Sequence, residues 1–187
     1  MFKAISPVEC TAVHEAGHVI ARVAFGYLPK SVTIEPAYKS DGQVEAPPDW
    51  LAAEAPDPVL GYDYRTRLEI EVIVDYAGPL AQAYFSQRAV DWAAGSNDQE
   101  HLDRTLRLLF PISSERVRQK FARAYERRAW KLVRGQAQAI ERLARDLLAY
   151  GTLSGEQIAA LCPEVLGSAR EEVPWLAKGP NRRAGQH

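Results

Sequence analysis

Cysteine is scarce in this chain of 187 residues: Cys10 and Cys162 lie far apart in the sequence and form no CxxC pair. The sequence therefore predicts neither a disulfide framework nor a cysteine-rich zinc module. Long apolar runs are also missing, because the longest stretch without a charged residue covers only residues 76–87. A membrane-spanning helix needs about 20 predominantly apolar residues, so we expect no membrane span. The N-terminus lacks the basic start and apolar core of a secretory signal, and we expect a cytoplasmic protein.

A strong net charge is absent as well, since 23 basic and 24 acidic residues leave a formal charge of −1. The charges are nevertheless divided: residues 35–103 carry 14 acidic and 4 basic side chains, and residues 104–145 carry 12 basic and 3 acidic ones. Apolar residues recur at helical spacing within the basic segment, so its charges are expected on a solvated helix face. The acidic half offers them an intramolecular or intersubunit partner. We therefore expect no nucleic acid as a partner.

Composition and helix signals predict one mainly α-helical domain with a small β element. Hydrophobic residues make up 47% and charged residues 25%, close to an average soluble domain. Ser6, Pro7 and Glu9 have the N-cap, first-turn proline and capping-box pattern of a helix that ends near Phe25. We expect a helical bundle with a short hairpin or edge strand. The strands are expected at residues 31–35 and 43–45, and helices at residues 62–88, 98–110 and 154–161. Residues 115–150 are expected to form a long helix, or a pair of helices interrupted at Gly135.

Two segments are expected to lack regular structure. Residues 46–61 contain four prolines and end on Gly61, which is typical of a surface loop. The domain itself is expected to span residues 1–165, and residues 166–187 to form a partly disordered C-terminal tail.

The pentad His14-Glu15-Ala16-Gly17-His18 is an HExxH motif inside the first expected helix. Residues four apart on an α-helix differ by only about 40° around its axis, so both imidazoles can bind one metal ion. Glu15 could then act as general base toward a water activated by that ion, as in zinc hydrolases. The alternative is a helix that merely carries two surface or core histidines. Gly17 costs about 1 kcal/mol relative to Ala inside a helix, which predicts that another backbone or a substrate approaches closely there.

A catalytic zinc site usually has a third protein ligand and leaves the fourth position to water. Residues 19–24 lack the histidine and glycine of the extended metzincin motif, so the third ligand must come from a distant segment. The best cluster is residues 96–101, in which Asp98, Glu100 and His101 could each coordinate. Composition does not choose between them, and helix N-terminal capping also explains Asp98 and Glu100.

Three blocks of this sequence resemble the peptidase domain of the FtsH family of zinc proteases, from about residue 11 to residue 161. They are the pentad followed by Leu-Pro-Lys-Ser-Val-Thr-Ile at residues 28–34, Tyr-Ala-Gly-Pro-Leu-Ala at residues 76–81 leading to Gly-Ser-Asn-Asp at residues 95–98, and the helical stretch 125–161. The resemblance implies a zincin-like FtsH peptidase fold.

In that family the matching positions imply that His14, His18 and Asp98 bind Zn²⁺ and that Glu15 is the general base. The resemblance further implies that residues 32–35, after the metal-binding helix, form an edge strand that binds substrate backbone by strand addition. The predicted function is therefore that of a zinc-dependent metalloendopeptidase, which hydrolyses peptide bonds with a zinc-activated water.

FtsH proteins place a membrane anchor and an ATPase domain before the peptidase. Here only 13 residues precede His14, and no Gly-Lys pair is present for a Walker A loop. We therefore expect activity that is independent of ATP in isolation, on polypeptides that are unfolded, small or delivered by a separate ATPase or adaptor partner. A homo-oligomer is compatible with the rings that the family forms. The alternative function is a non-hydrolytic binding or regulatory module that keeps the FtsH-like fold and retains zinc.

Overall fold

Helix α1 (Pro7–Ala24) carries the pentad and starts as its sequence predicts. The computed structural model describes residues 6–35, 42–45, 60–90 and 96–170. In it the Ser6 hydroxyl accepts the Glu9 N–H, and the Glu9 carboxylate accepts the Ser6 N–H. Two N–H groups that a helix start leaves unpaired are thereby satisfied. The helix ends before Gly26, whose φ of 94° is a conformation that residues with a Cβ rarely adopt.

Helix α2 (Tyr64–Ser86) forms the centre of the molecule, because every residue from Thr66 to Ala81 is buried. Asp63 caps its N-terminus by accepting the Thr66 N–H. Burial on all sides encloses charged residues as well as apolar ones: Arg67, Glu69, Glu71 and Asp75. Buried charges need partners, so α2 requires polar groups from the helices around it.

The crossing of α1 and α2 explains Gly17. A Cβ added at this position would lie 2.7 Å from the carbonyl oxygen of Ala77 and 2.7 Å from the Cβ of Ala81. The prediction that another backbone approaches Gly17 closely is confirmed.

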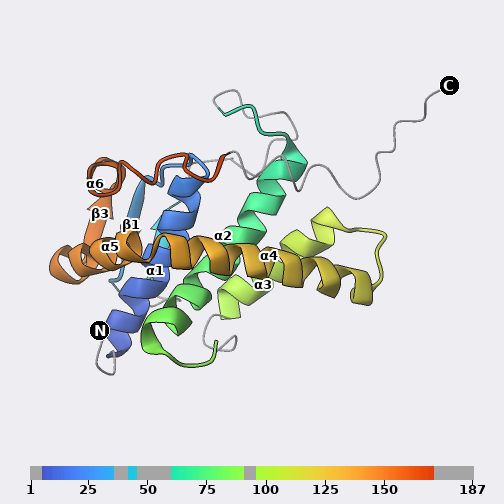
Figure 1. The fold of residues 1–187 in the computed structure, drawn as a ribbon, viewed down its shortest axis with the longest axis horizontal. Coiled ribbons are helices and arrows are strands. Elements are labelled where there is room, and N and C mark those ends of the chain that lie inside the picture. The colour runs from blue at the N-terminus through green and yellow to red at the C-terminus, as the bar shows by residue number, and fades with distance from the viewer. Residues whose placement is uncertain (1–5, 36–41, 46–59, 91–95, 171–187) are drawn as a thin grey trace.

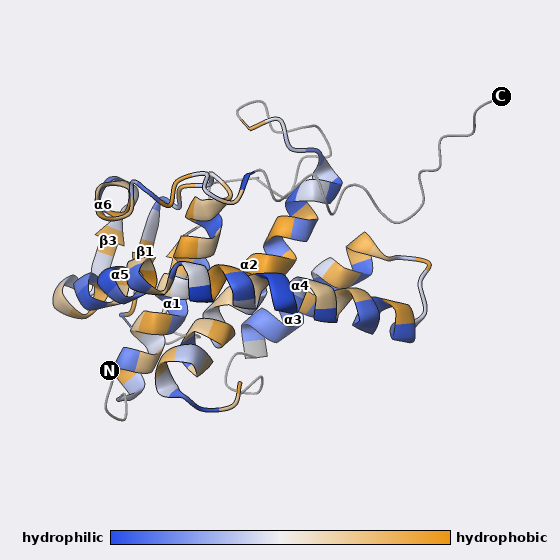
Figure 2. Cartoon of the chain, in the orientation of Figure 1, coloured by the Kyte–Doolittle hydropathy of each residue, from blue (hydrophilic) through white to orange (hydrophobic). Residues whose placement is uncertain are grey.

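Helices α4 (Glu115–Gly135) and α5 (Ala137–Tyr150) follow one another along the long axis of the molecule, where α4 packs on α2 and α5 packs on α1 (Figure 1). The predicted interruption at Gly135 is confirmed, since Gln136 separates the two helices. The buried residues of α4 are Tyr125, Ala129 and Val133, four apart on one face, and hydrophilic residues line its visible side (Figure 2). Helix α4, which forms the middle of the basic segment, is thus amphipathic with a solvated face, as predicted.

Helices α3 (Ser96–Leu109) and α6 (Gly155–Leu161) complete the bundle. Helix α3 packs on α2 and ends before Pro111. It starts two residues earlier than the sequence predicts, so Asp98 lies inside its first turn rather than at its first position. Helix α6 begins with a second capping box, between Ser154 and Gln157.

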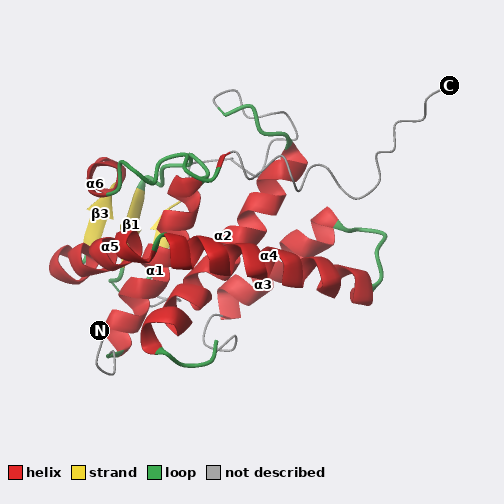
Figure 3. Cartoon of the chain, in the orientation of Figure 1, coloured by secondary structure: helices red, strands yellow, loops and turns green. Residues whose placement is uncertain are grey.

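The β element is a three-stranded antiparallel sheet of β1 (Ser31–Thr33), β2 (Gln43–Glu45) and β3 (Thr152–Ser154) in the order β2-β1-β3 (Figure 3). Val32 pairs with Val44 on one side and with Leu153 on the other. The predicted hairpin is confirmed, but the prediction that residues 32–35 form an edge strand is wrong. The strand is central because β3 pairs with its other side. The sequence shows no sign of β3, which is only three residues long, ends on the N-cap Ser154 of α6 and has no alternating pattern.

Ordered packing continues past residue 165 on the C-terminal side. The N–H groups of Gly167 and Ala169 donate to the carbonyls of Val23 and Ala24, which closes the end of α1. The predicted loop at residues 46–61 lies almost entirely outside the described residues, as does the predicted tail from residue 171 onward. Within the part of the chain that the structure describes, no helix is long and apolar enough to cross a membrane.

Candidate metal centre

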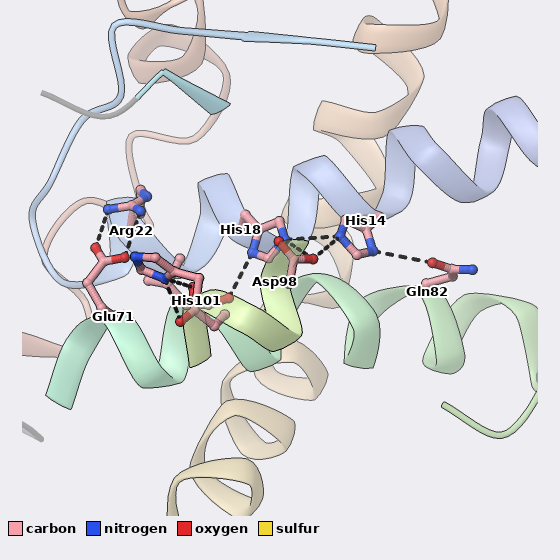
Figure 4. A network of polar contacts seen from close by, with 9 residues as sticks. His14, His18, Arg22, Glu71, Gln82, Asp98 and His101 are labelled. Carbon is pink, nitrogen blue, oxygen red and sulfur yellow. Dashed lines mark hydrogen bonds and ion pairs between the residues drawn. The ribbon is translucent and has the colours of Figure 1, made fainter. Parts of the chain in front are cut away.

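The two histidines of the pentad and one carboxylate from a distant helix converge on one point (Figure 4). Asp98 Oδ2 lies 2.8 Å from His14 Nε2 and 3.3 Å from His18 Nε2, and the two Nε2 atoms are 3.0 Å apart. Ligand atoms around a tetrahedral zinc ion with bonds of about 2.0–2.1 Å stand about 3.3 Å from one another. The three side chains therefore need to spread by only a few tenths of an ångström to surround such an ion.

Hydrogen bonds on the far side of each ring orient the histidines. His18 Nδ1 donates to the carbonyl oxygen of Val74 at 2.8 Å, and His14 Nδ1 donates to Gln82 Oε1 at 3.3 Å. In the neutral rings each Nε2 then carries a lone pair, and both lone pairs face each other and the Asp98 carboxylate. Three electron pairs pointing at one place repel unless a cation or a proton lies between them. This donor set fits zinc, which binds imidazole nitrogen and carboxylate oxygen.

The close approach of these side chains shifts the pKa values of His18 and Asp98. Burial by itself lowers the pKa of His18, but the hydrogen bond and charge of Asp98, together with the charge of Glu15, outweigh it and raise this pKa to about 9. Burial likewise raises the pKa of Asp98, but its contacts with His14 and His18 hold that pKa well below the usual range. In the absence of metal a proton on His18 thus takes the role of the cation.

Glu15 follows His14 on α1 and is 8% exposed. Burial raises the pKa of its carboxyl group, against the opposing charges of His18 and His14. A Cβ added at Gly42, just before β2, would lie 2.7 Å from Glu15 Oε1, so the chain passes close against this carboxylate. A raised pKa is what a general base that works near neutral pH requires.

Helix α2 packs closely against the His18 ring. A Cβ added at Gly78 would overlap the His18 ring. Gly78 thus lets the backbone of α2 approach the ligand closely enough for the Val74 carbonyl to orient it.

The structure separates the three candidates for a third ligand. Asp98 reaches both pentad histidines, Glu100 is exposed, and His101 donates from Nδ1 to both carboxylate oxygens of Asp75 at 2.9 and 3.0 Å. The sequence reading missed Asp75 and also Glu71, which binds Arg22. Two acids four apart among the otherwise apolar residues 70–77 were the available signal, because buried carboxylates imply a partner.

Comparison with protein-family models and with curated proteins gave no match to this chain.

Proposed function

We propose that this protein is a zinc-dependent metalloendopeptidase with an FtsH-like peptidase fold. The observation that carries the proposal is the convergence of His14 Nε2, His18 Nε2 and Asp98 Oδ2 within 3.3 Å of one another, from segments 84 residues apart, beside the buried Glu15. The HExxH spacing and the resemblance of the surrounding blocks to FtsH peptidases support the same conclusion.

The roles of the side chains follow from their positions. His14, His18 and Asp98 would hold the ion and leave one side of it open. A bound zinc ion lowers the pKa of a water to about 7 and polarises a carbonyl. Glu15 accepts the proton of the attacking water and passes it to the leaving amine. Val74 and Gln82 keep the two histidine rings in the tautomer that ligation needs.

The sheet supplies a candidate surface for the substrate backbone. Both sides of β1 are paired, whereas β2 pairs with β1 on one side and with no other strand among the described residues. Gly42 leads into β2 and lies against Glu15, so a segment added to the outer edge of β2 would run beside the general base. Strand addition requires an extended chain, which agrees with substrates that are unfolded, small or delivered by a separate ATPase or adaptor.

The test is cleavage of a library of unstructured fluorogenic peptides by zinc-loaded protein. Glu15→Gln keeps the size of the side chain and removes its basicity, so it should bind one zinc ion per chain and lose at least about 100-fold in kcat/KM. Asp98→Ala should lose both zinc and cleavage. Zinc content, measured by atomic emission on the same samples, separates the two effects.

Cleavage that survives in Glu15→Gln would contradict the proposal. If the wild type binds one zinc ion and cleaves no peptide, the non-hydrolytic binding module becomes the better description of this chain.

A further inference from the structure

One helical turn beyond the proposed metal ligands, a second set of polar residues joins the same three helices, and the two that α2 contributes are buried. Arg22 follows His18 by four residues on α1, and His101 follows Asp98 by three on α3, so each lies near the ligand-bearing face of its helix. Helix α2 supplies two acids that are themselves four residues apart. These four residues, Arg22, Glu71, Asp75 and His101, are named the inner tier. Figure 4 labels Arg22, Glu71 and His101.

Two ion pairs build the inner tier. Arg22 donates from its two terminal nitrogens to the two carboxylate oxygens of Glu71 at 2.5 and 2.9 Å. His101 donates to Asp75, which is 7% exposed, and Glu71 is 1% exposed. The hydrogen bond to Asp75 raises the pKa of His101, which favours its charged form. Both oxygens of each buried carboxylate are thus paired with a nitrogen donor.

The inner tier has the donor atoms of a metal site, but both of its carboxylates already have partners. Atoms of Glu71, Asp75 and His101 lie within 4.8 Å of one another, close enough to surround an ion. The guanidinium of Arg22, however, engages both oxygens of Glu71, and His101 engages both oxygens of Asp75. A metal ion would have to displace both of these donors, so the contacts favour a structural role.

Helix α2 connects this tier to the metal centre through consecutive residues. The carbonyl of Val74 orients His18 of α1, and the side chain of the next residue, Asp75, holds His101 of α3. Asp98 is the one candidate ligand that does not come from α1, and it lies in the first turn of α3. His101, one turn further along, is the nearest residue of α3 with a charged contact to α2 among the residues that the structure describes.

We propose that the Asp75–His101 pair positions Asp98 for metal binding, so that Asp75 and His101 are positioning residues of the metal centre. This inference rests on the metal centre proposed above. Loss of either partner frees the start of α3, and metal affinity should fall by about 10- to 100-fold, as for other groups that support metal ligands. Cobalt can test this, because its visible spectrum reports the number and geometry of its ligands.

The experiment is titration of metal-free protein with Co²⁺, followed by its visible absorption. The variants are His101→Gln, Asp75→Asn, the double variant Asp75→Asn/His101→Gln, and Asp98→Ala as the reference for a lost ligand. Leu106→Ala is the matched control, because Leu106 is a buried residue of the same helix two turns from Asp98. Circular dichroism establishes that each variant is folded.

We expect each single variant to weaken Co²⁺ binding about 10- to 100-fold and to shift the spectrum toward that of Asp98→Ala. The double variant should lose no more than the worse single variant, since the pair acts as a unit, and Leu106→Ala should keep the wild-type spectrum. The double variant leaves no buried charge unpaired. If a single variant does not fold, the Co²⁺ binding of the double variant is compared with that of the wild type instead.

Wild-type affinity and spectrum in folded His101→Gln would overturn this inference alone. Two Co²⁺ ions per wild-type chain, with one lost in His101→Gln, would overturn it by making His101 a ligand. A wild type that binds no Co²⁺ would instead overturn the metal centre itself.

Discussion

At the scale of single residues, the environment of Glu15 depends on a glycine from another segment. Gly42 lies against the Glu15 carboxylate, which occupies the space that a side chain at this position would need. A methyl group at this position would meet Oε1, Cγ and Cδ of Glu15 at 2.7–2.9 Å. Such distances are below ordinary van der Waals contact, and either the carboxylate or the chain before β2 must move.

We therefore predict that Gly42→Ala lowers kcat/KM by about 10- to 100-fold, because small displacements of a catalytic group have effects of this size. Zinc content should stay at the wild-type level, since the three atoms nearest to the added Cβ all belong to Glu15, which is not a proposed ligand. Peptide cleavage and zinc analysis on the same sample measure both. The matched control is Gly135→Ala, where an added Cβ meets nothing within 4 Å. Unchanged cleavage in Gly42→Ala would show that Glu15 is free to adjust.

At the scale of elements, the metal centre depends on how closely α1 and α2 cross. Gly17 and Gly78 face each other's helices: the first accommodates the backbone of Ala77, and the second accommodates the ring of His18. Glycine lowers helix propensity at both positions, by about 1 kcal/mol relative to Ala. The cost is offset by an approach close enough for the Val74 carbonyl to reach His18.

We predict that Gly17→Ala destabilises the protein by about 1–3 kcal/mol, because overpacking outweighs the gain in helix propensity. Gly135→Ala, at the open end of α4, should instead stabilise it by up to about 1 kcal/mol. Urea unfolding of the metal-free proteins measures both free energies. If both substitutions stabilised the chain to the same extent, α1 and α2 would not be in close contact at Gly17.

At the scale of the whole molecule, convergence of the ligands should couple stability to pH and to metal. In the metal-free protein the pKa of His18 is about 9 when folded, against 6.5 as the ordinary value. A raised folded pKa contributes stability that is complete below about pH 6.5 and is lost as the pH rises through 9. Asp98 acts in the opposite sense, since its lowered pKa contributes stability above pH 3.8 that is lost in acid.

We predict that the free energy of unfolding of EDTA-treated protein falls between pH 6.5 and 9, by on the order of 3 kcal/mol. Saturating zinc should reverse this trend, because the ion competes with the proton on His18 and binds more tightly as the pH rises. Urea titrations across this range measure both trends. His101 changes stability in the same direction, so the control is His18→Gln, in which the decline should be smaller. A flat profile for the metal-free wild type would contradict the prediction.

Sequence by itself determined the local features of this protein. The capping box of Ser6, the interruption after Gly135 and the shared face of His14 and His18 were all predicted, and the structure has each of them. These features depend on contacts between residues about four apart, which the repeat of the α-helix fixes. The close approach at Gly17 followed from the same reasoning, because an unfavourable helix residue implies a compensating contact.

Only the tertiary structure decided which distant groups meet. Residue reasoning alone left Asp98, Glu100 and His101 open as third ligand; the fold brings Asp98 to His14 across 84 residues of sequence and turns His101 toward Asp75. The fold also places β1 between β2 and β3. No local sequence pattern predicts that β3 pairs with β1. Contacts of this kind depend on the packing of the whole domain around α2, and a helical or strand period within one segment carries no information about that packing.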